Sequence, residues 1–125
     1  MVAEVSLSIP GGVDAPSQAR TALRALHPEL RPDTVQIVTL LVSELVTNAI
    51  RHGAAESVAL HAQVLAGCVR VDVTDEGPGF TSGPNPEIPD AQGGWGLFLV
   101  DQLANRWGVQ DEGKAGTHVW LEVDR

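Results

Sequence analysis

A carboxylate and a carboxamide lie one helical turn apart in the apolar stretch LLVSELVTNAIRHG, residues 40–53. At about 100° per residue, Glu44, Asn48 and Arg51 fall on one strip of a helix, and mainly aliphatic residues fill the opposite side. Most polar strips of this kind are solvated faces. A helix that buries one side while aligning these groups is also a candidate floor for a polar site, and the rest of the chain must decide between the two interpretations.

A second candidate group is Asp75, which ends an apolar strand-like run and is followed by Glu76-Gly77-Pro78-Gly79. Its carboxylate is aligned to accept hydrogen bonds from an amine of a ligand. Glycines have no Cβ, so they allow a ligand to approach the backbone closely. The alternative is a plain turn, since Asp and Gly are common turn residues.

A third candidate is Gly94-Trp95-Gly96, which opens a predicted helix. The free amides and the positive dipole end of a helix can bind a phosphate there, although the glycines can also simply give the helix a flexible start. The preceding loop, residues 81–94, is rich in glycine and proline. Loops of that length in a compact domain are usually functional lids or disordered, and we interpret this one as a lid. Residues 113–117 are most simply a hairpin turn.

Composition argues against several other functions. The 125 residues carry a formal net charge of −8 and only eight scattered Lys and Arg, so no direct nucleic-acid partner is expected. One cysteine, Cys68, and four separated histidines make zinc an unlikely ligand, and Ser43 and Cys68 lack the context of a nucleophilic triad. Gly113-Lys114 lacks the spacing of a phosphate loop. We find no signal peptide and no apolar run of the roughly 20 residues that a membrane span needs, and therefore expect a cytoplasmic protein without membrane contact.

Hydrophobic periodicity predicts the elements that position these groups. Alternation of apolar and polar residues predicts strands at residues 2–9, 58–65, 69–74, 109–112 and 117–123, with Ala66-Gly67 as a hairpin turn. A helical period predicts helices at residues 15–26, 33–51 and 96–107. Asp33 and Gln36 are expected to form a capping box, His27-Pro28 to end the first helix and Gly108 the third. The order indicates one α+β domain, a two-layer α/β sandwich whose mixed, mostly antiparallel sheet is covered by three helices on one face.

Four segments, in this order along the chain, resemble the motifs of the GHKL ATPase superfamily. Its members have the Bergerat ATP-binding fold and include type II topoisomerases, Hsp90, MutL and histidine-kinase catalytic domains. SELVTNAIRHG resembles the N box, DEGPGF the first glycine box, GGWGLFLVDQLA the second, and GKAGTHVWLEV the final glycine-and-threonine strand. The resemblance covers essentially the whole chain. It is closest to the small bacterial anti-sigma factor serine/threonine kinases and their stand-alone ATP-binding relatives.

The resemblance implies a role for each matching residue. Glu44 matches the catalytic base, and Asn48 matches the ligand of the Mg²⁺ that bridges the ATP phosphates; magnesium prefers oxygen ligands. Asp75 matches the acceptor for the adenine amino group, and Thr117 a residue on the adenine side of the pocket. The other implied ATP-binding positions are His52, Gly77, Gly79, Gly94, Gly96 and Leu97. The pattern alone also allows His52 to favour the dipole at the end of its helix.

The resemblance further implies the partners. With ATP and Mg²⁺ as cofactors, the protein would phosphorylate a serine of an anti-anti-sigma-like protein, sequester a sigma factor, or do both, and it would form a homodimer. Trp95, however, stands where many relatives carry a basic residue, and residues 81–93 contain no Lys or Arg. The alternative is therefore an ATP-dependent adaptor that holds a regulatory partner with negligible turnover. A histidine-kinase catalytic domain is a weaker alternative, because we expect no dimerisation and phosphoacceptor segment.

Overall fold

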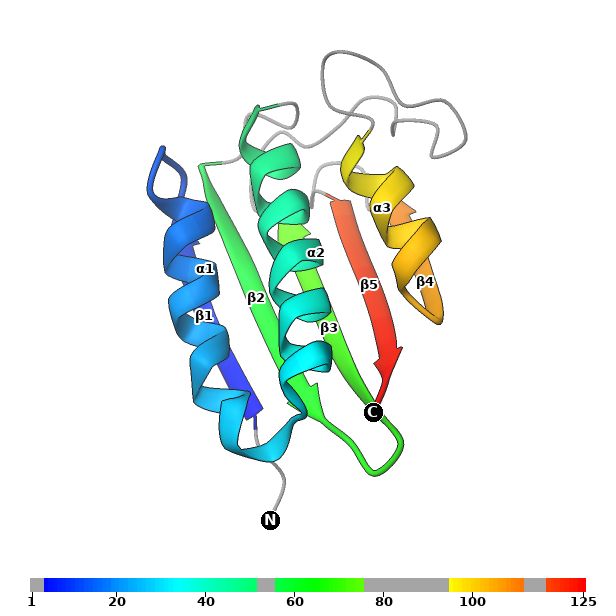
Figure 1. The fold of residues 1–125 in the computed structure, drawn as a ribbon. Coiled ribbons are helices and arrows are strands. Elements are labelled where there is room, and N and C mark those ends of the chain that lie inside the picture. Colours follow the sequence, from blue (N-terminus) through cyan, green and yellow to red (C-terminus); the bar gives the residue numbers. More distant parts are fainter. Residues whose placement is uncertain (1–3, 52–55, 76–94, 112–116) are drawn as a thin grey trace.

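The computed structural model describes residues 4–51, 56–75, 95–111 and 117–125 (Figure 1). The helices are α1 (Ala15–Leu23), the 3-10 helix η1 (Arg24–Glu29), α2 (Pro32–Arg51) and α3 (Trp95–Leu103). The strands are β1 (Glu4–Pro10), β2 (Ser57–Val64), β3 (Cys68–Asp75), β4 (Arg106–Asp111) and β5 (Thr117–Asp124).

The strands form one sheet in the order β1-β2-β3-β5-β4. Helices α1, α2 and α3 lie side by side on one face of this sheet (Figure 1). The predicted α+β two-layer sandwich is thus confirmed. Every pairing among the described strands is antiparallel, so the sheet is not mixed. The reason is that β4 and β5 pair as neighbours in sequence and β5 then runs opposite to β3, which leaves no parallel pair.

Residues of the central strands alternate between the two faces of the sheet, and on β2, β3 and β5 the buried positions alternate with half-buried ones. The buried positions face the helices and are almost all aliphatic. They are Val58, Leu60, Ala62, Val64, Val69, Val71, Val73, Val119, Leu121 and Val123. The other set of positions forms the open face of the sheet, which carries polar side chains.

Helix α2 completes the core from the other layer, because it packs against α1, α3 and three strands. Its buried residues recur at helical spacing: Val38, Leu41, Val42, Leu45, Val46 and Ala49. By length and composition, Pro32–Ile50 also meets the criteria for a membrane span, and core helices of globular proteins meet them too. Its packing on the sheet identifies α2 as a core helix.

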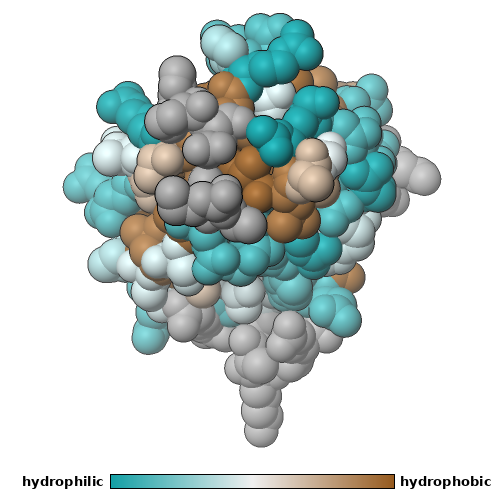
Figure 2. Space-filling view, turned by 90° about the horizontal axis from the view of Figure 1, so that it is seen from below, coloured by the Kyte–Doolittle hydropathy of each residue, from teal (hydrophilic) through white to brown (hydrophobic). Residues whose placement is uncertain are grey.

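Figure 2 views the molecule from below, where hydrophobic surface gathers near the middle and hydrophilic residues surround it.

Three predicted helix start or stop signals are wrong. Helix α2 begins at Pro32, so Asp33 lies in its first turn instead of capping it. Proline suits the first helical position, which needs no amide donor, and an acidic residue in the first turn still favours the dipole. Helix α1 ends at Leu23, and the chain continues through residues 24–29 as the 3-10 helix, so His27-Pro28 does not end an α-helix at residue 26.

The third wrong signal concerns Trp107 and Gly108, which belong to β4 rather than to the end and stop of a helix. Trp107 pairs with Leu121 of β5 and packs partly buried against the core. Its indole Nε1 donates to Asp101 Oδ1 of α3 at 3.1 Å. An apolar residue shortly after a short helix fits either period, so only the partner strand decides the assignment.

The turn between β2 and β3 agrees with the prediction. The backbone amide of Leu65 donates to the carbonyl of Cys68 at 2.8 Å, which leaves Ala66 and Gly67 as the two turn residues. This tight hairpin sets the register in which Val58 pairs with Asp75. It therefore fixes where β3 ends, and with it the position of Asp75.

Candidate functional site

Three buried polar side chains interrupt the apolar core. Asp75, Thr117 and Asn48 have exposed fractions of 2%, 4% and 6%. Among the described residues, the only other buried polar side chain is Thr34, in the first turn of α2. Burying a polar group in an apolar environment is unfavourable unless it finds a partner. Convergent polar groups in an otherwise apolar region are typical of a binding site, so these three residues are candidates for one.

The fold brings these three residues to one end of the sandwich. Asp75 is the last residue of β3 and Thr117 the first of β5, and the register that pairs Thr74 with His118 makes them neighbours on adjacent strands. Both alternate with the buried valines, so both face the helices. The C-terminal end of α2 and the N-terminal end of α3 lie at the same end (Figure 1).

The buried groups fit a polar, nitrogen-rich ligand. A carboxylate such as that of Asp75 accepts hydrogen bonds from an amine, and a carboxamide such as that of Asn48 offers an oxygen ligand as well as two N–H donors. The hydroxyl of Thr117 has no hydrogen-bond partner among the described residues. A buried hydroxyl without a partner costs about 1–3 kcal/mol. A ligand that supplied this partner would recover that free energy, so these residues fit the implied nucleotide.

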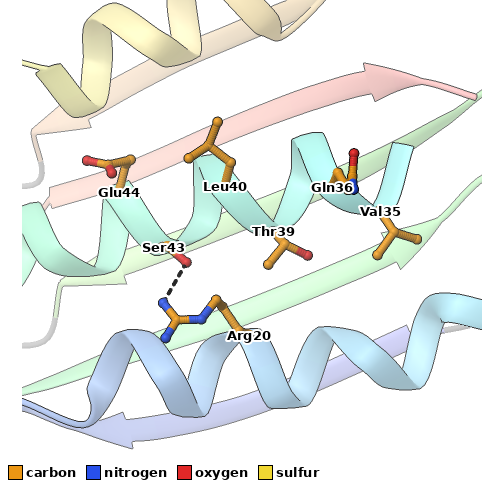
Figure 3. Close-up of a pocket in the computed structure, with 7 residues that line it drawn as sticks. All are labelled: Arg20, Val35, Gln36, Thr39, Leu40, Ser43 and Glu44. Atoms are coloured by element: carbon orange, nitrogen blue, oxygen red, sulfur yellow. Dashed lines mark hydrogen bonds between the residues drawn. The ribbon is translucent and has the colours of Figure 1, made fainter. Parts of the chain in front are cut away.

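Glu44 lies one turn before Asn48 on α2 and is half-buried. It borders a surface groove of about 470 Å³ between α1 and α2, which is lined by Arg20, Val35, Gln36, Thr39, Leu40, Ser43 and Glu44 (Figure 3). In this groove, Arg20 Nη1 donates to Ser43 Oγ at 3.2 Å. Figure 3 shows Ser43 pointing toward α1 and Glu44 pointing away from it. The Glu44 carboxylate makes no ion pair with a described residue.

Gly96 and Leu97 lie in the first turn of α3, where backbone amides lack partners within the helix. The start of α3 therefore lies at the same end of the sandwich as Asp75 and Thr117. His52, Gly77, Gly79, Gly94 and the predicted lid lie outside the described residues. The roles predicted for these positions therefore stay predictions.

The open face of the same strands carries a cluster that the sequence analysis treated only as alternating strand positions. Asp72 of β3 contacts His118 Nε2 of β5 through Oδ1 at 2.7 Å. Arg70 donates to both oxygens of Asp72 at 3.2 Å and lies over the Trp120 ring, 4.7 Å from its centroid. The usable signal was the pair of opposite charges at positions 70 and 72, since such residues share one face of a strand.

These contacts change the acidity of Asp72. Burial raises the pKa of its carboxyl, but hydrogen bonds from Arg70 and His118 outweigh burial and hold that pKa below its usual value. No group of three or more His, Cys, Asp or Glu in the described part of the chain is arranged to hold a metal ion. A metal at the candidate site would consequently depend on oxygen ligands such as that of Asn48 together with ligands from a bound molecule.

Comparison with known proteins shows a family and several similar solved chains. The model of the histidine kinase-like ATPase domain matches residues 11–123. None of the curated proteins matches the sequence. The chain is similar to the crystal structure of the RsbU and RsbW domains of Rv1364c from Mycobacterium tuberculosis, with a TM-score of 0.73 and 25% identity. The similarity covers 97% of this chain and 31% of that chain, so this chain spans about a third of the length of that crystallised chain.

The family match runs from the loop after β1 to the end of the sheet, and it includes Glu44, Asn48, Asp75 and Thr117. The structural similarity extends over almost the whole chain and agrees with the order of elements. The chain therefore belongs to the histidine kinase-like ATPase domain family and has the GHKL-type, anti-sigma factor kinase-like fold of an ATP-binding domain.

Proposed function

We propose that the chain acts as one domain, a cytoplasmic ATP-dependent serine/threonine protein kinase of the anti-sigma factor type. It transfers the γ-phosphoryl group of ATP to a serine of an anti-anti-sigma-like protein, sequesters a sigma factor, or does both. The observation that carries this proposal is the convergence of buried Asn48, Asp75 and Thr117 at one end of an otherwise apolar core, within a chain of the ATPase family.

Binding follows from the chemistry of the three buried groups. The Asp75 carboxylate accepts a hydrogen bond from the adenine amino group, and the Thr117 hydroxyl supplies a second polar contact on the same side. Asn48 would hold Mg²⁺ through its side-chain carbonyl oxygen, since magnesium prefers oxygen ligands. The first turn of α3 offers backbone amides to the phosphates, because the N-terminal end of a helix attracts anions.

Catalysis requires little covalent chemistry from the protein. ATP with Mg²⁺ supplies the phosphoryl group and neutralises part of its negative charge, so the protein mainly positions the reactants. Glu44 accepts the proton of the substrate serine hydroxyl through a carboxylate oxygen. Its half-buried position, one turn from Asn48, keeps this base next to the phosphate end of the site while leaving it open to a protein substrate.

The second candidate function is an ATP-dependent adaptor that holds its regulatory partner with negligible turnover. It is favoured by Trp95 at the start of α3. Many members of the GHKL superfamily carry a basic residue at this position, which would face the phosphates. Without that charge, stabilisation of the transferring group would rest on Mg²⁺ and the helix amides. The two functions share ATP binding and differ only in phosphoryl transfer.

The test combines ATP binding with label transfer. The full chain is incubated with γ-labelled ATP, Mg²⁺ and a panel of purified anti-anti-sigma-like proteins, and Mg-ATP affinity is measured by calorimetry. Asn48→Ala is expected to weaken Mg-ATP binding about tenfold or more, because a contact to a charged ligand is lost. Glu44→Ala is expected to lower transfer by about a hundredfold or more with nearly unchanged ATP affinity.

Gln36→Ala is the matched control, since Gln36 is an exposed residue of the same helix and lines the groove beside Glu44. It should leave both ATP affinity and transfer unchanged. ATP and partner binding without transfer would replace the kinase by the adaptor. A wild-type chain that gains no thermal stability from millimolar Mg-ATP would reject both functions, because a ligand that binds only the folded state must stabilise it.

A further inference from the structure

Asp72 and His118 lie on the open face of the sheet, on the same two strand ends that carry the candidate site on the other face. His118 directly follows Thr117, and consecutive strand residues point to opposite faces. Asp72 precedes Asp75 by three positions, so these two also point to opposite faces. The Asp72–His118 contact therefore lies behind the pair of residues that line the site.

The direction of the contact matters for the position of β5. In the register, Asp72 is paired with Trp120, whereas its carboxylate reaches His118, two residues closer to the start of β5. The contact is thus diagonal across the two strands. Diagonal neighbours on one face are within reach of long side chains, and such cross-strand pairs help to fix register. This diagonal opposes displacement of the first residues of β5 away from β3.

Asp72 is itself held in place by its own strand and by β5. Arg70 donates to both of its carboxylate oxygens at 3.2 Å, and the guanidinium stacks over Trp120 while also reaching Glu122 Oε2 at 3.5 Å. The side chains of Asp72 and His118 are only 19% and 20% exposed. A contact between two restrained, largely covered side chains loses less entropy than one between mobile surface side chains.

We propose that Asp72 and His118 are positioning residues for the nucleotide site. Their contact holds the start of β5 against the end of β3, so that Thr117 stays beside Asp75 and both meet the base together. Thr117 is the first residue of its strand, where a ladder of backbone hydrogen bonds opens most easily. This inference rests on the proposed binding of ATP by Asp75 and Thr117.

The experiment measures Mg-ATP affinity of the full chain, together with KM for ATP and kcat of label transfer. His118→Ala is expected to weaken ATP binding about three- to fivefold, the size of one cross-strand pair, with the loss in KM and not in kcat. His118→Gln should stay within about twofold of wild type, because its amide can still donate to Asp72. A purely structural role would not give this split between KM and kcat.

The matched control is His61→Ala. His61 also faces a carboxylate on the open face, with its Nε2 3.4 Å from Glu4 Oε1, but it joins β1 and β2, which carry no residue of the candidate site. It should leave ATP affinity within about 1.5-fold of wild type. Asp72→Ala and the Asp72→Ala/His118→Ala double variant complete a cycle, in which the two losses are expected not to add.

Equal effects of His118→Ala and His61→Ala, no effect of either, failure of glutamine to restore affinity, or additive losses in the cycle would each overturn the inference. All of these leave the wild-type affinity intact and hence the proposed function. A wild-type chain that binds no Mg-ATP would reject the proposed function, and the positioning role with it. The two failures are therefore distinguishable in the same measurements.

Discussion

The two faces of the central strands β3 and β5 differ in what they contribute. The helix-facing side is aliphatic from Val69 to Val73 and from Val119 to Val123, and it becomes polar only at the strand ends, with Asp75 and Thr117. The open side carries mainly polar side chains besides Cys68 and Trp120, and the charges of Arg70, Asp72 and Glu122 are paired with one another.

This difference separates stability from function. On the helix face, burial of apolar area supplies most of the folding free energy, so each polar residue there is a cost that needs a reason. On the open face, partly exposed ion pairs contribute little each and chiefly fix how the strands align. A polar residue on the apolar, helix-facing side therefore indicates a binding site. A polar residue on the open side needs no such explanation.

The contrast between the two faces of the sheet is tested most strongly by two consecutive residues of β2, one on the helix face and one on the open face. Leu60 is 1% exposed on the helix face, and Leu60→Ala is expected to lower the free energy of unfolding by about 3 kcal/mol, because it leaves a cavity. His61→Ala, on the open face, should change it by less than about 1 kcal/mol. Urea denaturation of both variants measures the contrast, and equal losses would contradict it.

Gly108 of β4 tests whether the open face is closely packed at Trp120. A Cβ at this position would lie 2.6 Å from Trp120 Nε1, so Gly108→Ala should lower the free energy of unfolding by about 1–3 kcal/mol. Gly67→Ala is the control, since a Cβ there meets no atom within 4 Å. Trp120→Ala should remove the penalty at Gly108, as measured by urea denaturation of the double variant. A penalty that persisted without the indole would show another cause.

Thr117 tests whether the polar end of the helix face is maintained for a ligand. Thr117→Val keeps the shape but removes a buried hydroxyl that has no partner in the described part of the chain. The free energy of unfolding without nucleotide is then expected to rise by about 1 kcal/mol, while Mg-ATP affinity falls. Thr117→Ser, which retains the hydroxyl, should keep the affinity. Denaturation and calorimetry would reject this if valine lowered stability.

Asp72 tests the ionic contribution of the open face through pH. Its pKa is lower in the folded protein than the ordinary value of 3.8, so the unfolded chain binds a proton more readily. The stabilisation is therefore fully present above the unfolded pKa and is lost as pH falls through the folded pKa. Asp72→Asn should cost about 1 kcal/mol at pH 7, and its difference from wild type should shrink as pH falls below about 4. Denaturation curves from pH 3 to 7 measure this difference, which a constant gap would contradict.

Much of the fold could be predicted because its elements have clean periods. The alternation in β2, β3 and β5 and the aliphatic stripe of α2 record which side of each element is buried, and the structure confirms them. The predictions failed where local signals were ambiguous. Trp107 fits a helix as well as a strand until β5 is present to pair with it, and Pro32 and Asp33 are both acceptable helix starts.

The residues of the candidate site could be predicted, but their arrangement in space could not. Asn48, Asp75 and Thr117 were selected by their resemblance to family motifs, and the structure buries all three at one end of the core. Their roles with ATP stay predictions. The Asp72–His118 contact could not be foreseen, because it joins residues 46 positions apart and depends on strand order as well as alternation.

The sequence by itself determined the α+β class, the buried faces and the family, because periodicity and motif order are written in residue types. The strand order β1-β2-β3-β5-β4 and the meeting of Asp75 with Thr117 were decided only by tertiary structure. The physical reason is that α3 and β4 lie between β3 and β5 along the chain, so their pairing joins distant segments. Such a contact between distant segments is selected by burial of the whole apolar face, and no local pattern specifies it.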